Sequence, residues 1–129
     1  MDEKTSRHFA EIIELAESIF KNVVYEIDAT PDRSILRIKA EYEKYEILVT
    51  ELISDGKRKY RYYVMKEDWV EAGFDNAADP RAIKLRYGKI GKEHAGENIP
   101  HLHTENKTKI QITEEMTFTD FVEWLKSNL

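Results

Sequence analysis

The sequence predicts a single α+β domain over residues 1–129: a four- to five-stranded antiparallel meander, with an N-terminal and a C-terminal helix packed on one face. Three observations predict it. Apolar residues recur every three or four positions near both ends, apolar and polar residues alternate between them, and the links between alternating stretches are short. The first pattern is typical of amphipathic helices and the second of half-buried strands. Short links favour antiparallel strands, because parallel strands need long crossovers.

The elements follow in order along the chain. Residues 6–20 carry a helical apolar stripe with glutamates between its members. Strand alternation follows in four stretches, at residues 23–29, 35–42, 45–53 and 58–66. Asp55-Gly56 joins the last two stretches and is the preferred pair for a type I′ hairpin turn, which needs positive φ at both positions.

At the C-terminal end, Thr117 and Asp120 have the spacing of a capping box ahead of a second apolar stripe. The segment 67–113 between the strands and this helix holds three of the four histidines and reads mostly as loop. A short helix at 80–87 and a strand at 107–112 are the only elements expected in it. Because long irregular segments in compact domains are often functional, we expect the site there.

The composition narrows the function classes. There is no cysteine, which excludes disulfides and thiolate metal sites. No apolar run is long enough to span a bilayer, and with no basic, then hydrophobic leader at the N-terminus we expect a soluble, cytoplasmic protein. Charged residues make up 35% of the chain, a composition that leans towards thermophiles. The net charge of -5 argues against general nucleic-acid binding, although lysines and arginines cluster in two segments.

His101 and His103 are the first candidate site. In an extended backbone they point the same way and can act on one ligand. Three interpretations stay open: structural histidines, metal-free acid–base or phosphate contact, and a divalent metal completed by His94 or Asp75.

Asp75 and Asn76 follow a glycine and a phenylalanine, and they either cap a local turn or supply a carboxylate that orients a histidine. Lys59, Arg61 and Tyr63 are expected on the outer face of their strand. There they are either ordinary strand residues or a surface that stacks a base and binds phosphate.

Three short motifs follow one another along the chain: Arg58-Lys59-Tyr60-Arg61-Tyr62-Tyr63, Phe74-Asp75-Asn76-Ala77 and Pro100-His101-Leu102-His103. With the C-terminal helix, they make residues 34–129 resemble the TumE-type toxins of bacterial and archaeal toxin–antitoxin modules. In the first histidine motif of that family a Pro-His pair continues where this chain has Ala78 and Asp79. The resemblance implies a small toxin that acts on RNA and is encoded beside an antitoxin protein.

The leading functional prediction is therefore a toxin-like, metal-independent ribonuclease without a cofactor. In it His101 and His103 exchange protons with the RNA, Asp75 orients one of them, and Arg61, with Lys59, Tyr63 and Asn76, binds substrate. The alternative is a non-catalytic binding module for an acidic protein or nucleic acid. A metal-dependent hydrolase is the third hypothesis. The expected partners are an antitoxin and RNA, without a membrane. The oligomeric state stays open and includes a homodimer.

Overall fold

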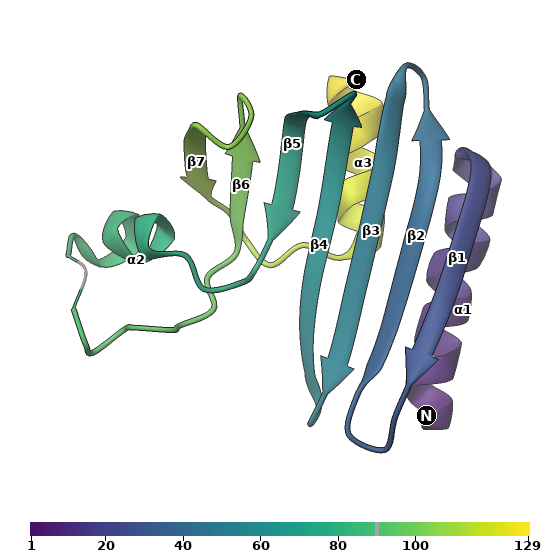
Figure 1. Ribbon diagram of the computed structural model, residues 1–129, viewed down its shortest axis with the longest axis horizontal. Helices are drawn as coiled ribbons and strands as arrows, with labels where there is room; N and C mark the ends of the chain where they lie inside the picture. Colours follow the sequence, from purple (N-terminus) through teal and green to yellow (C-terminus); the bar gives the residue numbers. More distant parts are fainter. Residues whose placement is uncertain (90) are drawn as a thin grey trace.

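The computed structural model describes residues 1–89 and 91–129, and within them it contains three helices and one antiparallel sheet of seven strands (Figure 1). The elements run in the order α1 (Glu3–Ile19), β1 (Lys21–Ala29), β2 (Ser34–Tyr42), β3 (Tyr45–Ser54), β4 (Lys57–Lys66), β5 (Trp69–Asp75), α2 (Pro80–Tyr87), β6 (His101–Thr104), β7 (Lys109–Ile112) and α3 (Phe118–Asn128).

The sheet is a meander in which each strand pairs with the next, from β1 to β7. The predicted topology is confirmed, but four to five strands is an undercount. Both missed strands, β5 and β6, lie in the segment that was predicted to be mostly loop. β6 has four residues, too few for an alternating pattern to stand out, and it pairs with β5 only after α2 and a long connection.

α2 occupies the predicted residues 80–87, but β7 begins at Lys109 rather than at residue 107. Glu105, Asn106 and Lys107 all have positive φ. This left-handed backbone turns the chain between β6 and β7 and cannot continue a strand.

α1 and α3 lie on the same face of the sheet, behind it in Figure 1, as the sequence predicts. Their apolar stripes share one core with alternating residues of β2 to β6. Tyr60 and Tyr62 of β4 are fully buried in it, and the ring of Tyr62 stacks on Phe121 of α3. None of the helices in the described ranges is long and apolar enough to cross a membrane.

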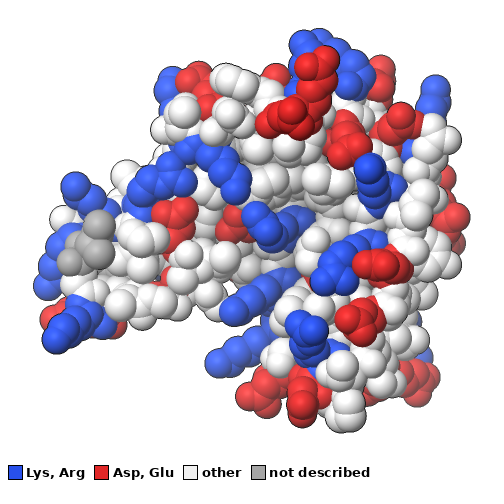
Figure 2. Space-filling model, in the orientation of Figure 1, with Lys and Arg blue, Asp and Glu red and all other residues white. Residues whose placement is uncertain are grey.

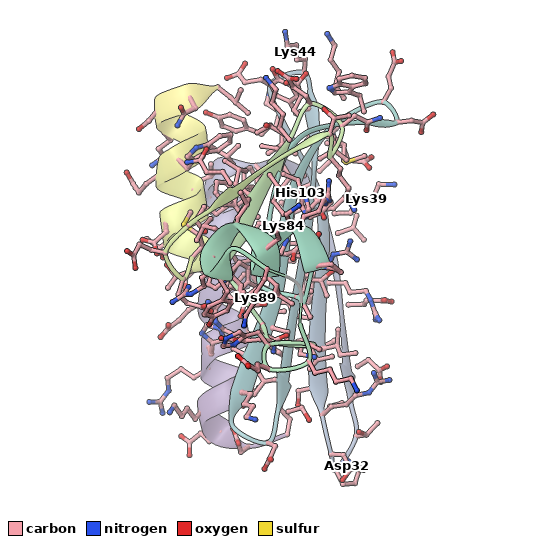
Figure 3. All side chains as sticks on the ribbon, turned by 90° about the vertical axis from the view of Figure 1, so that its left-hand side faces the viewer. Asp32, Lys39, Lys44, Lys84, Lys89 and His103 are labelled. Carbon is pink, nitrogen blue, oxygen red and sulfur yellow. The ribbon has the colours of Figure 1, made fainter. Side chains whose placement is uncertain are left out.

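Among the described residues, helical cover on the opposite face lies at its β6–β7 end. There Ala82 and Ile83 of α2 pack with Ile99, against Ile110 and Ile112 of β7. The remainder of this face is open, and Figure 2 shows Lys and Arg side chains mixed with Asp and Glu over it. In Figure 3, Lys39 projects from this open face, on the side away from α1 and α3.

Candidate functional site

Strand pairing brings three candidate residues together at the border between the covered and the open part of this face. Asp75, the last residue of β5, lies directly opposite His101 of β6, and Gly73 lies opposite His103. Because residues that face each other across a ladder share a side of the sheet, Asp75, His101 and His103 point the same way. The expected orientation of the two histidines is confirmed.

The three side chains converge through two ring nitrogens and the two carboxylate oxygens, and we call them the Asp75–His101–His103 cluster. His101 Nε2 lies 3.0 Å from Asp75 Oδ1 and 3.0 Å from His103 Nε2. His103 Nε2 lies 3.5 Å from Asp75 Oδ2. Each of the three residues is at most 4% exposed, so these contacts form in a region of low dielectric.

Neighbouring groups fix the orientation of His101 and Asp75. His101 Nδ1–H donates a hydrogen bond to the Ile99 carbonyl at 2.6 Å, which leaves Nε2 to face the carboxylate. The Ala77 amide donates to Asp75 Oδ1 at 3.0 Å, and the Tyr63 hydroxyl donates to Oδ2 at 3.1 Å. Hydrogen-bond partners outside the cluster therefore hold these side chains in place, as is common for metal ligands and catalytic groups.

The cluster shifts the acid–base behaviour of two of its members. Burial alone would raise the pKa of Asp75, but hydrogen bonds from His101 and His103 outweigh it and hold that pKa well below its usual range. Burial alone would lower the pKa of His101, but its bonds to Asp75 and to the Ile99 carbonyl outweigh this effect and raise that pKa. Asp75 is thus an anion that favours a positive charge beside it.

One atom of the cluster has no partner. His103 Nδ1 is buried and finds no hydrogen-bond partner among the described residues. Buried polar atoms are nearly always paired, so an unpaired ring nitrogen in a buried cluster is unusual and calls for an explanation.

The cluster opens into a small hollow of about 240 Å³ that cations surround. Arg61 of β4, Arg81 of α2 and Lys107 of the β6–β7 turn all line it, together with Asp79. Arg81 already donates to the Lys107 carbonyl at 2.7 Å and lies 3.3 Å from Asp79. The rim can attract an anion, while the base offers a carboxylate and two imidazoles.

Tyr63 lies on the predicted side of β4 but is only 7% exposed, which differs from the expected exposed ring. Its ring packs over Gly73, where the absence of a side chain leaves room for it. The guanidinium of Arg61 and the ammonium of Lys107 each lie 5.0 Å from the ring centre. Tyr63 is therefore not placed to stack a base, and in this structure it positions Asp75 through its hydroxyl.

Asn76 does not enter the hollow either. Its side-chain oxygen accepts from the Tyr60 amide at 3.0 Å, and its nitrogen donates to the Arg58 carbonyl at 3.0 Å. Just beyond the end of β5, the Asn76 side chain thus makes the hydrogen bonds to β4 that a neighbouring strand would make. These contacts agree with the structural alternative, and substrate contact by Asn76 stays a prediction.

Lys59 and His94 lie outside the hollow. Lys59 is exposed, and because it lies two residues before Arg61 in β4, both side chains are on the same face of the sheet. His94 pairs with Glu97 at 2.8 Å and stacks on Tyr87, so it does not supply a third nitrogen to the cluster.

A second polar cluster lies beneath α1 and was not expected. Glu51 of β3 is fully buried, and its carboxylate contacts His8 Nε2 at 2.7 Å, the Tyr62 hydroxyl at 2.5 Å and Arg58 Nη1 at 3.4 Å. It adjoins the larger hollow of about 580 Å³, which His8 and Arg58 help to line. Because protein groups already satisfy both carboxylate oxygens, we interpret this cluster as a structural tie between α1 and the sheet.

Sequence reasoning missed the rim residues Arg81 and Lys107 and the buried Glu51. A signal existed for Glu51, which stands at a core position of the alternation that contains Ile47 and Val49. No local signal marks Arg81 and Lys107, because the turn before β7 and the placement of α2 bring them to the hollow.

Comparison of the chain with protein-family models, with curated proteins and with solved structures gave no match. The resemblance to TumE-type toxins therefore stays a prediction.

Proposed function

We propose that this chain cleaves RNA at the Asp75–His101–His103 cluster and acts as the toxin of a toxin–antitoxin module. The observation that carries the proposal is a buried carboxylate–imidazole cluster at the base of a hollow whose rim holds three cations. Cations bind the phosphate backbone of RNA, and a polar cluster beneath them can act on the phosphodiester that they hold.

The open face offers a path for the backbone towards this hollow. Arg61 and Lys59 lie one strand repeat apart on it, and neither forms an ion pair with another described residue. Arg37 and Lys39, farther across the sheet, are already paired with Glu26 and Glu46. Lys59 and Arg61 are thus strand cations whose charge is available for a phosphate.

The roles divide between the rim and the base of the hollow. Arg61, Arg81 and Lys107 bind phosphate oxygens, and the cluster acts on the phosphodiester. Metal-free proton exchange by His101 and His103 stays a prediction for that step. The toxin role implies an antitoxin protein encoded alongside it.

The test is growth after induced expression, followed by RNA cleavage with purified protein. The first variant, His101→Ala/His103→Ala, removes the cluster, and circular dichroism must show that it is folded. The second, Arg81→Ala/Lys107→Ala, changes only the rim. Its matched control, Lys84→Ala/Lys109→Ala, removes the same charge from exposed positions of α2 and β7; Figure 3 shows Lys84 on α2.

We expect arrest and RNA cleavage with the wild type and the control, and neither with the cluster and rim variants. Raising the salt concentration should weaken RNA binding by the wild type, because cations carry it. Intact RNA with all four proteins, or equal cleavage by all four, would reject the proposal.

The second candidate function is a non-catalytic binding module. It is favoured by the burial of both histidines, which are 1% and 3% exposed. In that case the rim variant loses RNA or an acidic protein as a ligand, while the wild type binds RNA without cutting it.

A further inference from the structure

We infer that the Asp75–His101–His103 cluster is a binding site for a divalent transition-metal ion, with two imidazole nitrogens and one carboxylate oxygen as ligands. Among the described residues, these three form a group whose ligand atoms lie within 4.8 Å of one another. The inference rests on the geometry of the cluster and does not need the proposed function.

The separations of the ligand atoms fit a metal at their centre. Ligands about 2.1 Å from a metal lie about 3.4 Å apart in a tetrahedron and about 3.0 Å apart at neighbouring octahedral positions. In the cluster, the two contacts of His101 Nε2 measure 3.0 Å and the contact between His103 and Asp75 measures 3.5 Å. The two contacts of Asp75 use different carboxylate oxygens, so one cation can contact both ring nitrogens and the carboxylate with little movement.

Protons alone satisfy the same three atoms poorly. His101 Nδ1 donates to the Ile99 carbonyl, so a neutral His101 presents a lone pair at Nε2 to the carboxylate of Asp75. If His101 is protonated instead, its Nε2–H can donate to Asp75. His103 Nε2 then either accepts from the same N–H and cannot donate to Asp75, or donates to Asp75 and leaves two N–H groups facing each other at 3.0 Å. A cation at the centre attracts all three electron pairs at once.

The surroundings resemble the outer shell of a metal site. A backbone carbonyl fixes the tautomer of His101, and an amide and a tyrosine hydroxyl hold the carboxylate, as partners behind metal ligands do. Two histidines and one carboxylate suit Zn²⁺, Mn²⁺ or Fe²⁺ and leave further positions for water or substrate. Those positions face the hollow between Arg61, Arg81 and Lys107.

The test uses untagged protein freed of metal by chelation and then titrated calorimetrically with Zn²⁺ alone and with Mn²⁺ alone. His103→Gln removes one ligand. Tyr63→Phe keeps the ring and the ligands but removes the hydroxyl that holds Asp75. His94→Ala is the matched control, because it removes a histidine–carboxylate pair outside the cluster.

We expect one metal ion per chain in the wild type and in His94→Ala. Tyr63→Phe should weaken binding about 10-fold, a typical effect of removing an outer partner, and His103→Gln by more than that. Circular dichroism of each variant before titration shows that a loss of binding is not a loss of fold.

Two results would overturn the inference: no binding of either ion by folded wild-type protein, or binding lost in His94→Ala and unchanged in His103→Gln and Tyr63→Phe. The outcome is separable from the proposed function. If the protein binds metal but does not cleave RNA, only the proposed function is rejected. If metal-free protein cleaves RNA in the presence of a chelator and binds no metal, only the metal site is rejected.

Discussion

Replacing Gly73 by alanine tests how closely Tyr63 is packed over the strand that carries Asp75. A Cβ at Gly73 would lie 2.8, 2.9 and 3.0 Å from three ring atoms of Tyr63. Carbon atoms pack at about 3.5 Å or more, so the overlap is about 0.5 Å. Gly73 is paired with Tyr63 on one side and His103 on the other, and its backbone has little freedom to retreat. The ring must therefore move.

The expected magnitude follows from these contacts. Forcing a methyl group into a packed site lowers the free energy of unfolding by about 1–3 kcal/mol. If the moving ring also breaks the bond from its hydroxyl to Asp75 Oδ2, the loss of a hydrogen bond to a charged group adds about 1.5 kcal/mol. We expect Gly73→Ala to destabilise the protein by about 2 kcal/mol or more in total.

The assay is a double-mutant cycle with Tyr63→Ala, measured by denaturant unfolding. Without the ring, the new methyl group has space, and alanine loses less chain entropy than glycine on folding. In that background Gly73→Ala should therefore be neutral or stabilise by about 0.5–1 kcal/mol. If Gly73→Ala costs the same in both backgrounds, within about 0.5 kcal/mol, the packing argument is refuted.

Three further predictions concern stability. The pKa of His8 is raised in the fold, chiefly by its bond to Glu51. The stability lost in His8→Ala should therefore be largest below pH 6.5 and shrink as the pH rises through the raised value. Denaturant unfolding from pH 5 to 9 measures this loss, and a loss that grows with pH would contradict the prediction. Glu51→Gln should destabilise the protein by about 3 kcal/mol, because His8 and Arg58 lose their buried carboxylate partner. In the same assay Glu46→Gln, on the open face of the same strand, should cost less than about 0.5 kcal/mol. Asn76→Ala should cost about 1–3 kcal/mol, because it leaves the buried Tyr60 amide without its acceptor, and a melting temperature equal to that of the wild type would reject this role.

Local patterns were sufficient for much of the fold. β1 to β4 are long enough for a period of two to be visible, and Asp55-Gly56 marks the turn between β3 and β4. The capping box at Thr117 and Asp120 is present as predicted. In each case the determining interactions lie within a few residues along the chain.

The candidate site depends on contacts between distant parts of the sequence. The facing of His101 and His103 follows from the period of a strand, but their meeting with Asp75 requires β6 to pair with β5 in one register. The burial of Tyr63 depends on Gly73 in the neighbouring strand, and the role of Asn76 depends on the backbone of β4. No local propensity encodes such pairings, which is why Tyr63 and Asn76 were expected at the substrate.

Whether the Asp75–His101–His103 cluster acts on RNA is measured most directly by mapping RNA ends after incubation with purified protein. Wild-type protein and the folded Asp75→Asn variant are compared, with zinc added and with a chelator. We expect new ends with the wild type and at least a 100-fold slower appearance with Asp75→Asn, about 3 kcal/mol in the barrier. New ends at equal rates with both proteins, or with neither, would contradict this expectation.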